Sequence, residues 1–290
     1  MSIRYLLINS SLLYSTKKSL LVLNSLKPKV KPYYIRGSIV PFEEDAMHEF
    51  KGHRNLSIEE LPPWTQESKT EKSSRKSVSR TINAFLNTGY GGTVYLGIID
   101  SGKVSGLKLT QYQKDHVTGS LQDLMGRYTP PVKSHRYKIR FIPVLSKGYS
   151  EKDITRQCSY DSSSVVDITG RSREHLYRTH RYCWCDNDSN AQHNCGLLIA
   201  DYIIEIRIKP WDSTDSRNKD HGMGTLINLH PIHENEEGSV YFRRQASLVK
   251  VLLTKIFIFL YTPTFSYGCL LLSISQSVVD PLKATVLIQI

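Results

Sequence analysis

Acidic side chains that could bind a catalytic metal ion occur at two places in the first hundred residues. Glu44 and Glu49 precede Lys51, and Asp100 follows a β-rich run at 93–99. Converging carboxylates suit Mg²⁺ or Mn²⁺, which neutralise phosphate charge and activate water, and a nearby lysine can neutralise charge further. Because five positions separate Glu44 from Glu49, the two converge only if the chain bends between them. From spacing alone, a solvated acidic helix start followed by a strand is the alternative.

A second group of potential ligands lies in the middle of the chain. The chain has five cysteines, an odd number, and three of them fall within 183–195. This pattern favours free thiols or a metal site over a disulfide framework. Thiolate and imidazole suit tetrahedral Zn²⁺. The candidate zinc ligands are His180, Cys183, Cys185, His193 and Cys195. The alternative is an exposed polar loop with free thiols.

Basic residues dominate the charge balance, with a formal net charge of +11. A basic surface attracts polyanions, so nucleic acid or anionic lipid is the expected partner. The residues that we expect to contact an RNA backbone are Lys51 and two clusters, Lys72, Arg75, Lys76 and Arg80 on one helix face and Arg136, Lys138 and Arg140 on one strand face. A further cluster precedes the cysteines, at 171–181. Any one such cluster can equally be a solvated face.

The elements that must position these residues are visible in the hydrophobic pattern. Apolar residues at helical spacing predict a helix ending before Gly89 and a second one that Pro130 closes. Alternation or β-rich composition predicts strands at 48–51, 93–99, 137–141, 197–209 and 239–244. The predicted fold is α/β (α+β), a mixed sheet with flanking helices over 38–250. We interpret 1–37 as a leader or linker, and 146–196 as a polar inserted loop.

Three motifs taken together resemble the AlbA_2 domain of the Schlafen family. The first runs from Glu44 through Glu49-Phe-Lys51, the second is Ala84-Phe-Leu-Asn-Thr88, and the third runs from Gly91-Gly92 to Asp100. The segment 241–247 also resembles the closing strand of such domains. The resemblance covers about residues 40–250 and implies a single AlbA_2-like lobe.

The resemblance implies a metal-dependent endoribonuclease that acts on structured RNA such as tRNA. Glu44, Glu49 and Asp100 match the three acids of that site and would bind Mg²⁺ or Mn²⁺, whereas Ile99 replaces the first acid of the usual Asp pair. The family also carries a structural zinc site of Cys and His type. Schlafen cores pair two lobes around RNA, so we expect a homodimer or a related Schlafen-like partner. The alternative function is a non-catalytic nucleic-acid-binding module.

The C-terminal end, 251–290, raises a separate question. Residues 256–279 carry no charge, and this uncharged segment is long enough for a membrane anchor. A buried helix, a pair of strands or an end that does not fold are the alternatives. No secretory signal pattern is visible at the N-terminus. We therefore expect a cytoplasmic or nuclear protein, or alternatively one that the tail anchors to an intracellular membrane.

Overall fold

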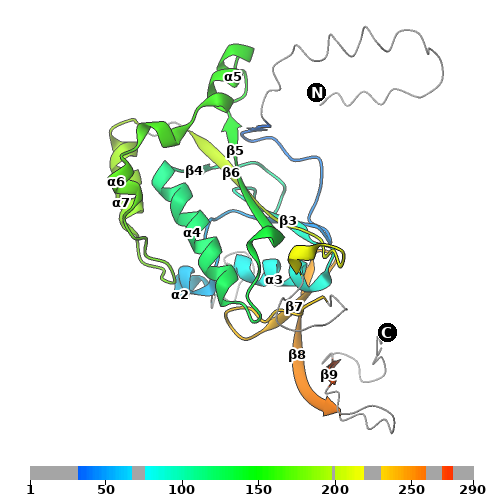
Figure 1. Ribbon diagram of the computed structural model, residues 1–290. Coiled ribbons are helices and arrows are strands. Elements are labelled where there is room, and N and C mark those ends of the chain that lie inside the picture. Colours follow the sequence, from blue (N-terminus) through cyan, green and yellow to red (C-terminus); the bar gives the residue numbers. More distant parts are fainter. Residues whose placement is uncertain (1–31, 67–75, 198–199, 219–229, 259–269, 277–290) are drawn as a thin grey trace, which may run out of the picture.

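The computed structural model describes residues 32–66, 76–197, 200–218, 230–258 and 270–276. Its body is an α+β fold in which helices flank a curled mixed sheet (Figure 1). The strand order is β1-β5-β6-β3-β2, and β4 pairs with β6. The strands of this sheet are β1 (Tyr34–Ile35), β2 (His48–Lys51), β3 (Gly92–Leu96), β4 (Leu107–Lys108), β5 (Tyr137–Leu145) and β6 (Asp201–Ile208).

The strand pairs at the two edges of the sheet are parallel, and the two central pairs are antiparallel. β2 runs parallel to β3, and β1 runs parallel to β5, whereas β6 is antiparallel to both of its long neighbours. β1 lies inside the segment that we predicted to be a leader, and the ordered body therefore starts earlier than residue 38. The predicted mixed sheet with flanking helices is confirmed.

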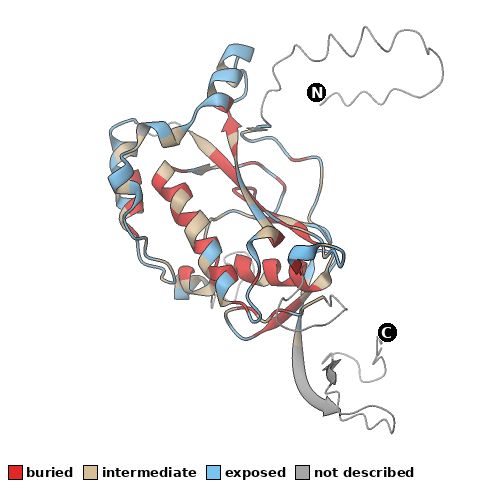
Figure 2. Cartoon of the chain, viewed as in Figure 1, coloured by how far each residue is buried: buried red, intermediate tan, exposed pale blue. Residues whose placement is uncertain are grey.

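Two helices cover one face of the sheet. α3 (Val78–Thr88) presents Val78, Ile82 and Phe85 to the core, at the spacing of one helix face. α4 (Gln111–Arg127) begins with a capping box in which the Thr110 hydroxyl accepts a hydrogen bond from the Gln113 backbone N–H. Figure 2 shows both helices buried on their inner sides. Their apolar faces and the inward residues of β3 and β6 form one large core.

The turn from α3 into β3 depends on glycine. Gly89 ends the helix in the left-handed conformation, with φ of 82°. A Cβ at Gly91 would collide with the backbone carbonyl oxygen of Ile208, and its φ is 70°. The glycines therefore let the chain reverse tightly against β6.

The predicted inserted loop is instead largely helical. It contains α5 (Glu151–Ser159), α6 (Ile168–Arg171) and α7 (Trp184–Asn194), with a 3₁₀ turn at Ser162–Val165. Polar residues start the first helices: the side chains of Ser150 and Asp167 each accept a hydrogen bond from a backbone N–H. Because these helices bury few apolar residues, hydrophobic periodicity did not reveal them. The other short helical elements are α2 (Pro63–Gln66) and 3₁₀ turns at Ile58–Glu60, Ser134–Arg136 and Ser216–Asn218.

A second, three-stranded sheet ends the described chain. It contains β7 (Val240–Arg244), β8 (Ser247–Ile258) and β9 (Leu270–Gln276), which pair antiparallel in that order. The rest of the predicted tail, 259–269 and 277–290, lies outside the described residues. Within the described ranges, no helix is both long and apolar enough to cross a membrane.

Candidate functional site: an acidic edge and a histidine–cysteine group

The short strand β2 carries two of the predicted site residues on one face. Glu49 and Lys51 are two positions apart and form an ion pair. Glu49 is buried, and its other oxygen lies 2.5 Å from Nη1 of Arg243, in a contact without hydrogen-bond alignment. The Thr81 hydroxyl on α3 donates to Glu49 at 3.4 Å. Glu49 is therefore held between two cations and a helix.

Glu44 reaches the same place because the chain bends between the two glutamates. The Asp45 carboxylate accepts hydrogen bonds from the backbone N–H groups of Met47, at 2.7 Å, and His48, at 2.8 Å, which closes the bend. Oε1 of Glu44 then accepts the N–H of Phe50 at 2.8 Å. Burial raises the pKa of Glu44, and the charges of Glu49 and Asp100 raise it further. The spacing of five is thus compatible with convergence.

Asp100 arrives from the neighbouring strand. Since β2 and β3 run parallel, with Lys51 beside Leu96, their carboxyl ends meet at one edge of the sheet. A turn follows β3, in which the Gly102 N–H donates to the Ile99 carbonyl oxygen at 2.8 Å, and it carries exposed Asp100. Glu44 and Asp100 line one cavity of ≈ 570 Å³. We call Glu44, Glu49, Lys51 and Asp100 the acidic edge.

Arg243 is a residue of this region that sequence reasoning missed. Its side chain is 0% exposed, and besides Glu49 it donates to the backbone carbonyl oxygens of Asp45 at 2.9 Å and His48 at 3.1 Å. It lies on β7 two positions after buried Tyr241, so the strand alternation could have marked it as buried. A buried arginine needs an acidic partner, and Glu49 is that partner.

The Ala84–Thr88 motif positions β7 and therefore Arg243. The Asn87 side chain donates to the carbonyl oxygens of His233 at 2.9 Å and Tyr241 at 3.1 Å. The Thr88 hydroxyl accepts the Arg243 backbone N–H at 3.0 Å. The motif thus contributes to the acidic edge indirectly, by fixing the strand that carries Arg243.

The first basic cluster is only partly described. Lys72 and Arg75 lie outside the described residues, and Lys76 is exposed just before α3. Arg80 forms a bidentate ion pair with Glu237, through Nε at 2.8 Å and Nη2 at 2.7 Å. The Arg80 guanidinium is thus already paired with a carboxylate of the same chain.

The structure separates the residues of the second basic cluster. The prediction that all three share one strand face is wrong for Arg136. Arg136 precedes β5, is only 4% exposed, and stacks on Trp211 with 4.6 Å from its guanidinium carbon to the ring centroid. It therefore does not share an open strand face with Lys138 and Arg140. The reason is that the strand begins one residue later, so the alternation that we extended to Arg136 does not apply there.

Lys138 and Arg140 do lie on the sheet face opposite α3 and α4. They stand beside Arg207 and Glu205 of β6, and Arg140 is ion-paired to Glu205. Part of this face is a hollow of ≈ 320 Å³ whose lining includes His48, Tyr90, Tyr95, Arg140 and Arg207. We call exposed Lys138, Arg140 and Arg207 the basic face; sequence reasoning did not single out Arg207.

The predicted zinc ligands do not all meet. Cys185 and Cys195 lie at opposite ends of α7, which separates them by about 15 Å at 1.5 Å per residue. His193 is in the last turn of α7, and His180 is exposed, with its ring 6.0 Å from that of Trp64. Sequence proximity therefore grouped residues that a helix holds apart.

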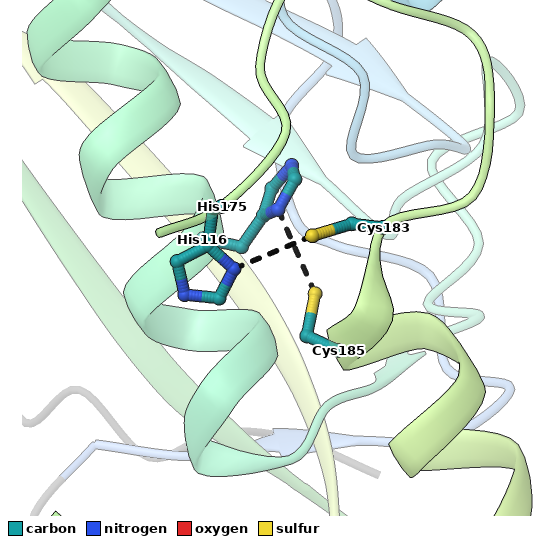
Figure 3. A group of neighbouring side chains, drawn as sticks. All are labelled: His116, His175, Cys183 and Cys185. Atoms are coloured by element: carbon teal, nitrogen blue, oxygen red, sulfur yellow. Dashed lines mark hydrogen bonds between the residues drawn. The ribbon is translucent and has the colours of Figure 1, made fainter. Parts of the chain in front are cut away.

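Two of those predicted ligands join two other histidines instead (Figure 3). The ligand atoms of this group all lie within 4.8 Å of one another, and its members are His116, His175, Cys183 and Cys185. Burial lowers the pKa of His116 to about 4 and also lowers that of His175, so both rings are neutral at neutral pH. Burial raises the pKa of the Cys185 thiol. We call these four residues the His–Cys group.

Comparison with protein families gives a match that covers most of the chain. The model of the family described as Schlafen, AlbA_2 matches residues 64–251. The match includes Asp100, Arg243 and the His–Cys group, and it begins after Glu44 and Glu49. The assignment of the two glutamates as site residues therefore depends on the motif resemblance and on their position in the structure.

Proposed function

The chain belongs to the Schlafen AlbA_2 family, which suggests a nucleic-acid-related function, and from this premise we propose that it is a metal-dependent endoribonuclease, or a subunit of one, acting on structured RNA such as tRNA. The observation that carries the proposal is the convergence of Glu44, Glu49 and Asp100 at the carboxyl ends of β2 and β3.

The donor set suits a hard divalent cation. Three carboxylates face two cations, Lys51 and Arg243, so the acidic edge retains one uncompensated negative charge when all are ionised. Oxygen ligands of this kind are what Mg²⁺ and Mn²⁺ prefer. Glu44 and Asp100 line the cavity and would hold the ion, with buried Glu49 as the third acid. Such an ion supplies charge neutralisation at the phosphate and an activated water.

The chain's own residues would then share the remaining tasks. Lys51 lies at the acidic edge beside Glu49 and would offset charge that develops on the phosphate. Arg243 positions β2 through the Asp45 and His48 carbonyl oxygens, and it forms an ion pair with buried Glu49. The basic face would bind the RNA backbone through phosphate contacts, which need no particular sequence.

The two surfaces are close enough to serve one substrate. Phe42 lines the acidic cavity, and its ring lies 4.8 Å from His48 and 5.2 Å from Tyr95, both of which line the basic hollow. An RNA strand that crosses Phe42 would therefore contact both. Because the resemblance implies a two-lobed groove, we also propose that the working unit is a homodimer or a complex with a related Schlafen-like chain.

The test is cleavage of total small RNA by the full chain with Mn²⁺. Glu44→Gln and Asp100→Asn should each lower the cleavage rate by at least about 100-fold, while RNA affinity stays within about threefold, because each change removes a ligand and no phosphate contact. Glu151→Gln, which changes an exposed carboxylate on α5, is the control and should cleave normally. Asp45 is unsuitable as a control, since its carboxylate closes the bend. Unchanged cleavage by Asp100→Asn would refute the assignment.

One observation favours a non-catalytic nucleic-acid-binding module as the second candidate. Glu49 already has two cationic partners, so the buried carboxylate is compensated without a metal ion. In that case the full chain would bind RNA with strong salt dependence and show no cleavage with any divalent ion. A version of this module tethered through the tail would also sediment with membranes.

A further inference from the structure

We propose that the hollow at the basic face binds one unpaired nucleotide of the RNA, with its base stacked on Tyr90 and its phosphate on Arg207. Both residues line this hollow of ≈ 320 Å³, a volume in the range of small ligand pockets. The nucleotide site rests on the proposed function, because it names the part of the RNA that the basic face would recognise. A cut made at the acidic edge would then fall beside an unpaired nucleotide.

Tyr90 is an exposed aromatic residue at the rim of the hollow. It is 73% exposed, and its side chain has no ring contact and no hydrogen bond among the described residues. Its ring is therefore available for stacking on a nucleobase, since every base has a flat π face. Single exposed apolar residues are common in soluble proteins, so the exposure of Tyr90 gains meaning only from its fixed position and its cationic neighbours.

The backbone on both sides of Tyr90 is anchored. Tyr90 stands between Gly89 and Gly91, which both have positive φ, at 82° and 70°. The carbonyl oxygen of Gly89 accepts the Trp211 N–H at 2.7 Å. Gly91 packs so closely on the end of β6 that a Cβ there would come within 2.4 Å of the Ile208 carbonyl oxygen. A ring held on such a backbone is preorganised, so stacking on it costs little conformational entropy.

Two cations of the basic face are open to a phosphate group. Arg207 of β6 and Lys138 of β5 are paired in register, and both side chains are exposed. Neither forms an ion pair within the described parts of the chain, whereas Arg140 is paired with Glu205. Arg207 also lines the hollow, so a nucleotide whose base lies on Tyr90 would have a cation for its phosphate.

The strand register continues this row of side chains toward the acidic edge. Arg207 is paired with Thr93 of β3, and Thr93 with His48 of β2, which is the edge strand of the sheet. The Phe42 ring lies 4.8 Å from that of His48 and lines the acidic cavity. An RNA strand that crosses the sheet along this row therefore passes from the hollow to the proposed metal site over the Phe42 ring.

These contacts favour an unpaired nucleotide over a duplex. The bases of an A-form helix are stacked on one another, and a loop or bulge nucleotide can turn its base outward to stack on a side chain. The Glu205 carboxylate at the hollow already accepts the Tyr34 hydroxyl at 2.8 Å and pairs with Arg140. Because this acid is engaged within the protein, we expect the hollow to accept any base.

The test is binding of the full chain, without divalent cations, to an RNA hairpin with one bulged 2-aminopurine and to the same hairpin with that base paired. We expect the bulged hairpin to bind about 10-fold more tightly, and stacking to quench its fluorescence. Tyr90→Ala should reduce the preference to less than about twofold and remove the quenching. Tyr149→Ala, which removes an exposed ring beyond the far end of β5, is the matched control and should keep both.

Equal affinity of the wild-type chain for the two hairpins would overturn the nucleotide site, and so would a preference that Tyr90→Ala retains. Because binding is measured without cleavage, the result is independent of the nuclease assignment. A chain that prefers the bulge but cleaves no RNA with Mn²⁺ would refute the nuclease and support the nucleotide site. A chain that cleaves RNA but shows no preference for the bulge would refute the nucleotide site alone.

Discussion

The acidic edge and the His–Cys group are both clusters of ligand side chains, but they differ in what surrounds them. The acidic edge borders a cavity, and its negative charge is only partly compensated, by Lys51 and buried Arg243. The His–Cys group is closed and its histidines are neutral at neutral pH. An open, charged site suits an exchangeable hard cation and a substrate, whereas a closed, soft site suits an ion that stays.

The difference also concerns what each site gives to the fold. The acidic edge is built on the central sheet and is held by backbone contacts from three separated segments. The His–Cys group joins the insertion to α4 where apolar contact is scarce. Loss of the divalent cation proposed for the acidic edge should therefore abolish RNA cleavage. Loss of the zinc ion that the resemblance implies should instead weaken the packing of the insertion against α4.

The largest effect should come from removing the arginine beneath the acidic edge. Arg243→Ala leaves Glu49 with one cation fewer in a buried place and removes two carbonyl contacts, so we expect the free energy of unfolding to fall by about 3–5 kcal/mol. Denaturant titration measures this. Its matched control is Arg244→Ala, because the exposed neighbour should change stability by less than about 0.5 kcal/mol. Equal effects of both changes would mean that Arg243 does not support this edge.

Substitutions at two glycines of α4 should distinguish the packing of the insertion from the stability of the helix itself. Gly119→Ala should push Tyr177 and the loop of His175 away and lower zinc retention at least about 10-fold, while Gly126→Ala, with open space around its Cβ, should keep zinc and stabilise the chain by about 0.5–1 kcal/mol. Elemental analysis and thermal unfolding measure the two effects. If Gly119→Ala behaves like Gly126→Ala, the loop is not held against α4 as described.

Changes to the basic face should weaken RNA binding and leave the acidic edge and the His–Cys group intact. Lys138→Ala with Arg207→Ala removes two exposed cations, so binding to unrelated RNAs should weaken alike and the salt slope should fall by about 1–2. Lys152→Ala with Arg156→Ala removes the same charge from α5 and should change the slope less. An equal change in both double variants would show that net charge, and not this face, sets the affinity.

A buried carboxyl outside both sites should give the smallest effect. Burial raises the pKa of Glu60 above that of an unfolded chain, despite hydrogen bonds from Ser120 and the Leu56 N–H. The folded state therefore binds this proton more tightly than the unfolded chain does. As the pH rises above about 4.5 and through the folded-state pKa, Glu60 lowers the free energy of unfolding. Glu60→Gln should make the free energy of unfolding fall less between pH 4.5 and 8. A steeper fall would contradict this.

The amino-acid pattern predicted the elements of the acidic edge well, because local periodicity determines them. The helix at 78–88 and the strand that carries Glu49 formed where helical spacing and β-rich composition indicated. The strand predicted at 93–99 also formed, but it ends at Leu96, and Asp100 lies in the turn that follows it. We did not predict Arg243 as a site residue because a charged residue after a polar loop is usually exposed. Strand alternation with Tyr241 could have indicated its burial, but its ion pair with Glu49 is visible only in the folded chain. Its role depends on a contact between residues far apart in the chain.

The His–Cys group shows the opposite case. Sequence proximity selected Cys183 and Cys185 correctly as members of a group, and it added His193 and Cys195, which α7 carries away from them. His116 could not be found this way, because it lies on a helix that packs against the insertion only in the folded chain. The insertion has no apolar periodicity from which its packing against α4 could be predicted.

Metal dependence of RNA cleavage is best measured on one sample of the full chain. The chain is desalted into metal-free buffer, assayed, and assayed again after Mn²⁺ is returned. If the acidic edge binds the catalytic ion, cleavage disappears on desalting and returns with Mn²⁺. Cleavage that survives the removal of exchangeable metal, or that Mn²⁺ restores equally in Asp100→Asn, would contradict this assignment.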